Sequence, residues 1–389
     1  MKVLWITGWY PNVHAPYEGD FIQRQALSAS LFDCIHVLYV NHSHGNTNSL
    51  SKVKVNSQLV ETTYYAYLPN NFFAKFNIYK QLLCFFHYKK RLDDYLQQFG
   101  RPDIIHIHIP LKLSLVGLWI KNRYKIPIVV SEHWGIYDRS VPDNIYFQSF
   151  VKKYLLRKFL RSVDDVISVS HYLGEGIKKF AGINSYRVIN NVVDTSVFNY
   201  KYHPHDTMKT ILHISNMDDI KNPNGILQVI RNVTNMRRDL RFIIIGVKTD
   251  KFEKLAADLG VDHTRICFIK EIPYLEVADY LHKSDALLMF SFAETFSCVT
   301  AEALCCGVPV AAVNRSAFPE LINEKNGVLA NKFSVNAMTD TLLVLLDNNK
   351  WDHKEIAADA ISKYAYSRVG KDISLLYGQI LANYHTVNS

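Results

Sequence analysis

The sequence predicts an α/β fold with two doubly wound, Rossmann-like parallel sheets in tandem. The chain has 389 residues, which is too many for one ordinary hydrophobic core. Short apolar runs of strand length recur along it and alternate with helical segments. These runs do not alternate strictly between apolar and polar residues, which is typical of strands covered by helices on both faces. Each half of the chain is therefore expected to form one sheet between helices.

Nine apolar runs mark the expected strands in order along the chain. The first half carries "KVLWIT", "CIHVLYV", "DIIHIHI", "IPIVVS" and "DDVISVS", and the second half carries "TILHIS", "RFIIIG", "ALLMFSF" and "VPVAAV". The helical segments between them supply the right-handed crossovers that parallel strands need. Ligands of open α/β sheets bind at the carboxyl ends of the strands, so we expect an active site in a cleft between the two sheets.

The boundary between the two domains is expected within residues 190–207. There the strand and helix periodicities stop, and Asn, Asp, Ser and Pro accumulate. We predict an N-terminal domain at 1–195 and a C-terminal domain at 196–368. The amphipathic segment 369–389 is predicted to be a final helix, able to pack back on the first domain.

Cysteine usage and the N-terminus indicate the compartment. The six cysteines are scattered without any CxxC pair, as in a cytosolic protein with reduced thiols. The N-terminal "MKVLWITGWYPN" enters a strand at once and lacks the features of a signal peptide. No apolar run has the length of a membrane-spanning helix. We predict a cytoplasmic protein, or a peripheral one on the cytosolic face of the inner membrane.

Charge is unevenly distributed along the chain. Residues 1–195 hold 23 Lys and Arg against 14 Asp and Glu, a net charge of +9, whereas the remaining residues have a net charge of −1. Two stretches of the basic half, 72–99 and 151–162, mix aromatic and basic residues. They are either surface helices with their aromatics packed inward, or an interfacial surface that docks on anionic lipid. A nucleic-acid partner is not expected, because no binding module for it is recognisable.

The stretch "FAETFSCVTAEALCCGVPVAA", residues 292–312, carries the clearest chemistry. Glu294 follows an apolar strand, and Phe296, Ser297 and Cys298 open the next helix, with Ser297 as the expected N-cap. The free N–H groups of a helix start suit a phosphate, and a carboxylate accepts hydrogen bonds well from sugar hydroxyls. Glu294 on a hexose, the helix start on a diphosphate and Glu302 on a ribose would match the layout of a nucleotide-sugar.

Several ordered motifs extend this pattern over nearly the whole chain. They are "WITGWYPN…YEGDFIQRQ", "PDIIHIH", "SEHW", "VISVSHYL", "VINNVVDTSVF", "HISNMDDIKN", and "ETFSCVTAEALCCGVPVAA" followed by "PELI…NGVL". In this order the chain resembles the retaining glycosyltransferases of family 4, which have the GT-B fold. The resemblance implies transfer of a sugar from a nucleotide-diphosphate-sugar to a saccharide or polyprenyl-diphosphate-linked acceptor. It also implies a place in surface polysaccharide biosynthesis and no cofactor.

The resemblance assigns roles on the donor side. Glu294 and Glu302 match the family's E-x7-E motif and would contact the donor sugar and the ribose. Lys221 matches the basic residue on the diphosphate, where a cation offsets the charge that grows on the leaving group. The family usually has an Arg five residues earlier, but this chain has Asn216. Either the helix N–H groups and Lys221 suffice, or another cation substitutes, for which the candidates are Arg24 and Arg315.

Other roles fall on the N-terminal domain. His133 in "SEHW" matches the family's active-site histidine, and Gly19 belongs to its N-terminal glycine loop. We predict front-face attack, in which the leaving phosphate takes the acceptor's proton and His133 orients sugar or acceptor. Trp134, Asp138 and His108 are candidates for acceptor contact. No carboxylate or cysteine cluster accompanies the histidines and no DxD motif is present, so we expect donor binding without a metal.

Two alternatives stay open. A sugar-nucleotide epimerase with the same architecture would turn over without an acceptor. A noncatalytic nucleotide-binding or membrane-associated protein would keep its role after loss of Glu294. A dinucleotide oxidoreductase and a P-loop enzyme are disfavoured, because neither G-x-G-x-x-G after a strand nor G-x4-G-K-[ST] occurs.

Overall fold

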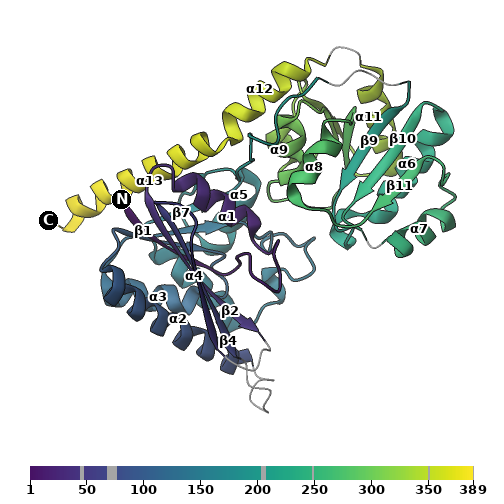
Figure 1. Cartoon of the computed structure of the whole chain (residues 1–389). Coiled ribbons are helices and arrows are strands. Elements are labelled where there is room, and N and C mark those ends of the chain that lie inside the picture. The colour runs from purple at the N-terminus through teal and green to yellow at the C-terminus, as the bar shows by residue number, and fades with distance from the viewer. Residues whose placement is uncertain (44–47, 68–76, 203–206, 248, 349–350, 389) are drawn as a thin grey trace. The chain divides into compact units, whose positions relative to one another are not determined.

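The structure is a computed structural model that describes residues 1–43, 48–67, 77–202, 207–247, 249–348 and 351–388 (Figure 1). The chain forms two compact units. The first unit comprises Met1–Tyr137, Asp143–Val192 and Tyr366–Ser389, and the second comprises Asp138–Pro142 and Val193–Ala365. Each unit holds one largely parallel sheet between helices, so the predicted fold class is confirmed.

The first unit is built on an eight-stranded sheet with the order β3-β4-β2-β1-β5-β6-β7-β8. Only β3 is antiparallel to its neighbour. The strands are β1 (Lys2–Thr7), β2 (Cys34–Ser43), β3 (Ser49–Lys54), β4 (Leu59–Tyr67), β5 (Ile104–His108), β6 (Ile128–Glu132), β7 (Asp165–Ser168) and β8 (Arg187–Val188). The central strands β5 and β6 are buried along their whole length, as expected where helices cover both faces.

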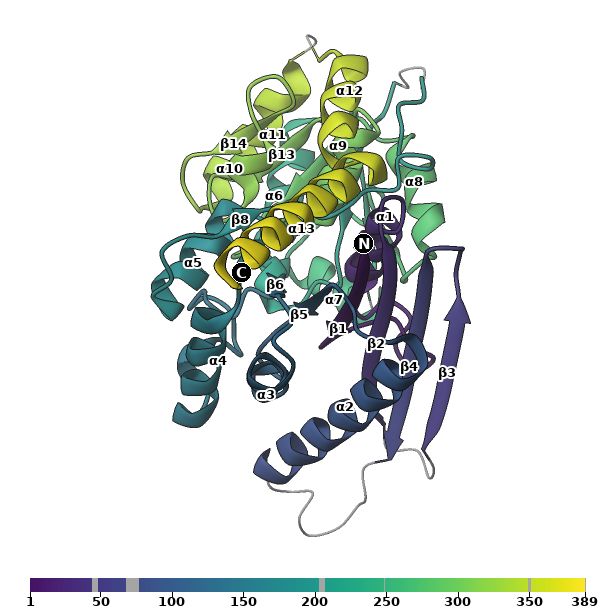
Figure 2. The ribbon, with the colours of Figure 1, turned by 90° about the vertical axis from the view of Figure 1, so that its left-hand side faces the viewer.

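Helices cover both faces of this sheet. Along one face run α2 (Asn77–Phe99), α3 (Ser114–Tyr124), α4 (Phe150–Ser162) and α5 (His171–Ala181), and Figure 2 shows the first three in succession. The short 3-10 helix η2 (Ile145–Phe147) precedes α4. The other face carries α1 (Asp20–Ala29) and the C-terminal helix α13 (Tyr366–Asn388), which pack against each other. The stretch 72–99 thus corresponds to α2, with 72–76 outside the described residues.

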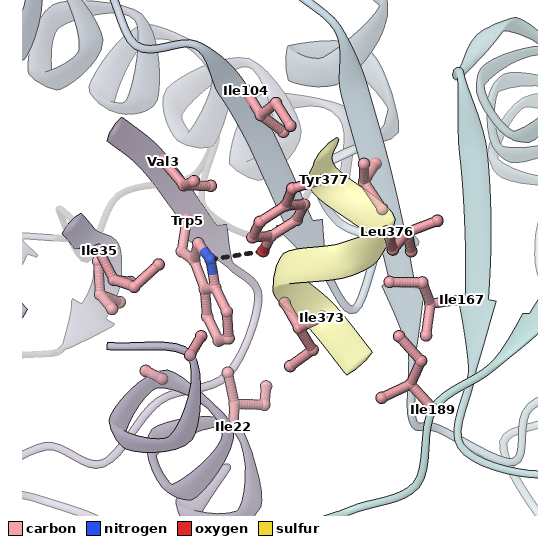
Figure 3. Close-up of a cluster of buried hydrophobic side chains, with 14 of the residues drawn as sticks. Val3, Trp5, Ile22, Ile35, Ile104, Ile167, Ile189, Ile373, Leu376 and Tyr377 are labelled. Atoms are coloured by element: carbon pink, nitrogen blue, oxygen red, sulfur yellow. Dashed lines mark hydrogen bonds between the residues drawn. The ribbon is translucent and has the colours of Figure 1, made fainter. Parts of the chain in front are cut away.

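The C-terminal helix is part of the core of the first unit (Figure 3). Val369, Ile373 and Tyr377 of α13 are buried in the cluster that also contains Trp5 and Ile22. The indole Nε1 of Trp5 donates a hydrogen bond to the hydroxyl of Tyr377 at 3.0 Å. The chain therefore completes its first hydrophobic core only with its last helix.

The second unit holds a six-stranded, wholly parallel sheet with the order β11-β10-β9-β12-β13-β14. Its strands are β9 (Lys209–Ile214), β10 (Leu240–Ile245), β11 (Ile266–Ile269), β12 (Ala286–Met289), β13 (Val310–Val313) and β14 (Gly327–Ala330). Helix α6 (Pro223–Met236) packs against α11 (Val335–Asp347), and α9 (Cys298–Cys305) against α12 (His353–Tyr364). The remaining helices are the 3-10 helix η3 (Asp219–Lys221), α7 (Thr249–Asp258), α8 (Tyr274–Leu281) and α10 (Phe318–Leu321).

The chain passes between the units at both ends of Asp138–Pro142, after Val192 and after Ala365. The segments at the last two crossings pair with each other, because Val193 N–H donates to Tyr364 O at 2.9 Å and Val193 bridges to Ala365. The main part of the second unit starts at Val193, three residues before the predicted 196, and α13 starts at Tyr366, three residues before the predicted 369. No helix among the described residues is long and apolar enough to cross a membrane.

Candidate active site

A partly buried ion pair occupies the carboxyl edge of the sheet in the second unit. The Nζ of Lys221 lies 2.7 Å from Oε1 of Glu294, and their side chains are 23% and 10% exposed. Burial lowers the pKa of Lys221, but the nearby Glu294 carboxylate outweighs this and raises the pKa above its ordinary value. Lys221 is therefore a cation at neutral pH, beside the end of β12.

Local backbone geometry explains why these two residues meet. Asp218 caps η3 by accepting from Lys221 N–H, and Asn222 then takes a left-handed conformation with a φ of 58° and caps α6. The Asn222 side chain donates to Phe290 O at 3.2 Å, and Phe292 N–H donates to Ile220 O at 2.7 Å. These bonds hold the Lys221 turn against the segment that leaves β12 toward Glu294.

Helix α9 starts at the residues for which the sequence predicts a phosphate site. Ser297 holds the N-cap position with a φ of 68°, a strained conformation for a residue with a side chain. Its hydroxyl lies 2.8 Å from that of Thr300 and makes no capping bond, so the predicted side-chain cap is wrong. The first helical residue is Cys298, and Phe296 is buried against Tyr364. A helix start leaves its first N–H groups without intrahelical partners.

Glu302 lies in the second turn of α9 and is 3% exposed. The helix ends at the predicted Gly-Val-Pro turn, where Gly307 has a φ of 80° and its carbonyl oxygen lies 2.7 Å from Nδ1 of His353. A Cβ on Gly307 would lie 2.4 Å from the carbonyl oxygen of His353, so only glycine fits. This turn returns the chain into β13 and keeps α9 over the sheet.

A pocket of about 730 Å³ opens at the carboxyl ends of β9, β10 and β11. Neither Lys221 nor Glu294 lines it, but Asp218, which accepts from Lys221 N–H, does. This volume falls in the range of ligand pockets, roughly 300–1,000 Å³. Gly246 lines it with a φ of 98°, and a Cβ there would lie 2.8 Å from Ser215 O. The other lining residues are Asn216, Met217, Asp218, Val247, Thr249, Asp250, Lys251, Phe252, Lys270 and Glu271.

Asn216 lies at the rim of this pocket, and its side chain donates to Asp218 Oδ2 at 3.2 Å. Of the two candidate substitutes for the absent arginine, Arg315 belongs to the same unit and follows β13, with its guanidinium carbon 4.9 Å from the ring centre of Phe333. Arg24 lies in α1 of the first unit and pairs with Asp20 at 2.7 Å. Arg315 is thus the candidate on the sheet that carries Lys221.

In the first unit, His133 follows β6 at the carboxyl edge of the sheet and is 5% exposed. Its Nδ1 lies 3.2 Å from Oδ1 of Asn191, and its Nε2 lies 3.3 Å from Nδ1 of His108. Because an amide oxygen only accepts, Nδ1 of His133 carries the proton and Nε2 accepts from His108. Burial lowers the pKa of His133 to about 3, so the ring is neutral. Both ring nitrogens are occupied, and a sugar contact requires one of these bonds to break.

His108 is fully buried behind His133, so its predicted role as an acceptor contact is corrected. Its Nε2 is buried and has no hydrogen-bond partner among the described residues. Next to it, His106 contacts the hydroxyls of Tyr377 at 2.6 Å and Ser131 at 2.7 Å. Burial lowers the pKa of both histidines well below the ordinary value. His108 lies against the ring of His133 and does not itself reach the surface.

Glu132 shapes the turn that presents His133 and Trp134. One oxygen accepts from the backbone N–H groups of both residues at 3.0 Å, and the other accepts from the hydroxyl of Tyr137 at 2.9 Å. Complete burial raises the pKa of Glu132 to about 7. This carboxylate lay within the quoted motif "SEHW" but was not singled out from the sequence.

The loop that contains Gly19 lies at the same carboxyl edge of the sheet in the first unit. Gly19 has a φ of 69° at the start of α1, and a Cβ on it would lie 2.9 Å from the backbone of Trp9. The ring centres of Trp9 and Trp134 lie 5.1 Å apart. Asp138, predicted on the N-terminal domain, lies four residues beyond Trp134 but belongs to the second unit. It is partly exposed and accepts from Ser140 N–H.

The structure brings the predicted residues together in two sets. Lys221, Glu294 and the start of α9 lie together in the second unit, whereas Gly19, His133 and Trp134 lie together in the first. Sequence analysis missed Asn191 and Gln25, whose Nε2 donates to Asn191 Oδ1 at 3.3 Å. Asn191 lies in the quoted hinge "VINNVVDTSVF", and only its contact with His133 reveals its role. In the described part of the chain, no group of three or more His, Cys, Asp or Glu side chains could hold a metal ion.

Two family models match the chain. The model described as "Glycosyl transferases group 1" matches residues 199–368, and the model described as "Glycosyltransferase Family 4" matches residues 25–197. Among relatives, "Alpha-monoglucosyldiacylglycerol synthase" of Streptococcus pneumoniae is 25% identical over 57% of this chain and 54% of its own length. The chain thus spans about half of that relative. "Putative teichuronic acid biosynthesis glycosyltransferase TuaC" of Bacillus subtilis is 21% identical over 97% of this chain and 98% of its own length.

Solved structures share the fold at low sequence identity. Sucrose-phosphate synthase from Thermosynechococcus elongatus has a TM-score of 0.77 and 14% identity, and the match covers 98% of this chain and 100% of that one. Alr3699/HepE from Anabaena, solved in complex with UDP and glucose, has a TM-score of 0.69 and 14% identity over 97% and 100% of the two chains.

Proposed function

Because the chain belongs to the GT-B glycosyltransferases that the group 1 and family 4 models describe, we propose that it transfers a sugar, with retention, from a nucleotide-diphosphate-sugar to a saccharide or lipid-linked saccharide. The observation that carries this proposal is the Lys221–Glu294 pair beside the start of α9. The pair combines a cation and a carboxylate near the start of a helix, at the sheet edge that also holds a pocket of about 730 Å³. These are the groups that a diphosphate and a hexose need.

The proposed reaction draws on the charge of Lys221. As the bond between the sugar and the diphosphate breaks, negative charge grows on the leaving phosphate, and a preorganised cation stabilises it. Lys221 moves from Glu294 toward the phosphate, and Glu294 becomes free to accept hydrogen bonds from the sugar hydroxyls. The leaving phosphate takes the proton of the acceptor hydroxyl, so attack occurs on the face that the phosphate leaves. No metal takes part in this proposal.

The first unit is proposed to bind the acceptor near Trp134. His133 is a positioning residue in the described arrangement, because its ring is held between His108 and Asn191. Two relatives named for glycolipid and cell-wall polymer synthesis support an acceptor linked to lipid or to a surface polysaccharide. A neighbour with UDP and glucose bound supports a uridine nucleotide as the first donor to test. We place the reaction at the cytosolic face of the membrane.

Thermal-shift measurement against a panel of nucleotide-sugars tests the donor. A ligand that binds only the native state raises the melting temperature, by a free energy that grows with its concentration over Kd. We expect one nucleotide-sugar to stabilise the protein, and Glu302→Ala to weaken the binding about tenfold by removing the ribose contact. The matched control is Glu324→Ala, an exposed carboxylate of the same unit.

The outcomes separate the alternatives. Rearrangement of the nucleotide-sugar without an acceptor would indicate an epimerase and overturn the transferase proposal. No stabilisation by any donor, or equal stabilisation of the Glu302→Ala variant, would overturn the assigned donor site.

A further inference from the structure

We propose that the η2–α4 tip, residues 146–154, is a docking surface for membranes that contain anionic lipids. The tip comprises the end of η2 and the first turn of α4. This inference rests on the proposed function, because a lipid-linked acceptor lies at a membrane surface. The segment belongs to the basic first unit, and its large apolar side chains are exposed.

The tip exposes an unusual amount of apolar surface. Phe147 is 80% exposed, Phe150 is 76% exposed, and Val151 and Tyr154 are 57% and 52% exposed. Phe150 and Tyr154 lie one turn apart with nearly parallel rings. Large apolar side chains clustered on the surface, rather than scattered singly, mark a place where another apolar phase binds.

These aromatics do not belong to the core of the first unit. Helix α4 already buries Leu156, Phe159 and Leu160 on its inner face. Farther along the helix, Arg157 Nε donates to Phe180 O at 3.0 Å, and the guanidinium lies over the Phe180 ring. The body of α4 is thus anchored on α5, while its first turn projects its apolar side chains outward.

Charge favours an anionic membrane as the occupant. From residue 144 to 163 the sequence contains five basic residues and no acidic one. Two of these lie at the tip: Lys152 Nζ donates to Gln148 Oε1 and Lys153 Nζ to Tyr146 O, each at 3.2 Å. Aromatic side chains surrounded by lysines combine insertion among lipid chains with attraction to anionic headgroups.

The tip is also held in a defined conformation. The Asn144 side chain accepts from Tyr146 N–H at 3.0 Å and so caps η2, and Ser149 accepts from Lys152 N–H and so caps α4. The segment therefore presents its aromatics with little loss of conformational entropy on binding.

The position of the tip in the fold suits an acceptor at the membrane. Strand β6 ends at Glu132, and the chain then runs through residues 133–149 to the start of α4. Because a crossover helix runs back along the sheet, its first turn lies toward the carboxyl edge. His133 and Trp134 occupy that edge. A membrane bound by the tip would hold a lipid-linked acceptor near the same edge.

Helix α2, the other aromatic and basic helix, fits the role less well. It exposes Leu82 and Phe86, but Tyr88, Leu92 and Tyr95 face inward and are buried. Its Arg91 pairs with Asp94 and lies over the Tyr64 ring. Lys80, Lys89 and Lys90 of α2 are exposed, but its large apolar side chains are less available than those of the η2–α4 tip.

Vesicle sedimentation of the full chain tests the proposal. The probes are phosphatidylcholine vesicles with and without phosphatidylglycerol, at low and high salt. We expect binding only to the anionic vesicles, weakened by salt. The double variant Phe147→Ser/Phe150→Ser is expected to lower the partition coefficient about tenfold or more. Lys152→Ser/Lys153→Ser is expected to lower it about fivefold per lysine and to reduce the salt dependence.

The matched control is Leu31→Ser/Phe32→Ser. These two exposed apolar residues follow α1, at the opposite edge of the same sheet. Unchanged vesicle binding of the tip variants, or an equal loss in the control, would overturn the proposal. So would a tip variant that abolishes self-association measured without vesicles, because the exposed aromatics would then serve a second copy of the chain.

Donor binding separates this proposal from the proposed function. The tip variants are expected to keep the thermal shift that a nucleotide-sugar produces, since the donor residues lie in the second unit. Vesicle binding without any donor-induced shift would leave the docking surface standing and overturn the transferase assignment. A donor-induced shift without vesicle binding would leave the transferase assignment standing and overturn the docking surface.

Discussion

Lys221 and Glu294 form an ion pair of 2.7 Å although 73 residues separate them along the chain. The pair forms because the η3 turn is hydrogen bonded to the backbone that follows β12. In the unliganded protein each charge thus neutralises the other. Under the proposed function, a donor replaces this ion pair with its own contacts to Lys221 and Glu294.

Replacing Lys221 by Ala is expected to reduce kcat by about 10²–10³, because one preorganised group on the developing charge contributes that much. The substitution also leaves Glu294 partly buried without its cation, so we expect a lower melting temperature. Steady-state kinetics and thermal unfolding measure the two effects. The matched control is Lys325→Ala, which breaks an exposed pair with Glu355 in the same unit. A Lys221→Ala enzyme with unchanged kcat would refute the role of the cation.

A substitution of Asn216 is expected to strengthen binding rather than weaken it. The resemblance to the family suggests that an arginine here would clamp the diphosphate, and Asn216 lies at the rim of the pocket. We expect Asn216→Arg to tighten nucleotide-diphosphate binding about tenfold, as a charge-assisted hydrogen bond allows. Isothermal titration with the nucleoside diphosphate measures it, with Asn216→Gln as the uncharged control. Weaker binding of the arginine variant would mean that Asp218 captures the new side chain.

Two glycines of α13 have opposite expected effects. A Cβ on Gly370 would lie 2.1 Å from the carbonyl oxygen of Ser28 in α1, whereas a Cβ on Gly378 would meet nothing within 4 Å. Gly370→Ala should lower the free energy of unfolding by roughly 1–3 kcal/mol through overpacking. Gly378→Ala should raise it by up to about 1 kcal/mol, since alanine favours a helix. Denaturant unfolding of both variants checks this, and equal effects would contradict the packing of α13 on α1.

Stability is expected to fall as the pH drops below about 6.5. Burial lowers the folded-state pKa of His106, His108 and His133, the last to about 3. Above pH 6.5 the folded and unfolded states are both neutral at these sites. Below pH 6.5 the unfolded state binds protons at these histidines and the folded state does not. The free energy of unfolding therefore falls by about 1.4 kcal/mol per histidine and pH unit.

Glu132 acts in the opposite sense. Its folded-state pKa is raised to about 7. Its stabilising contribution to the free energy of unfolding is therefore complete below its unfolded-state pKa and is lost as the pH rises toward 7. One carboxyl offsets only one of the three histidines, and the melting temperature should still drop between pH 7 and 5. His106→Gln should make the pH dependence shallower. A melting temperature that stays constant over this range would contradict neutral buried histidines.

The sequence alone predicted much of the architecture. All nine apolar runs coincide with strands of the structure, because a strand buried on both faces needs a continuous apolar segment. The strands it missed, β3, β4, β8, β11 and β14, are nearer the sheet edges or partly exposed, so their patterns are polar or short. The sequence also singled out the glutamates of the E-x7-E motif, Lys221 and His133, because short motifs can be read from the local order of residues, and their roles stay predictions.

Only the tertiary structure decided what those residues touch. The pairing of Lys221 with Glu294, the burial of His108 behind His133 and the contact of Tyr377 with Trp5 all join distant segments. It also decided that Phe147 and Phe150 face solvent while the aromatics of α2 mostly face inward. Local patterns determine strands and helices, since these depend on neighbours in the chain. Which faces are covered, and which charges meet, depends on how the sheets bring remote segments together.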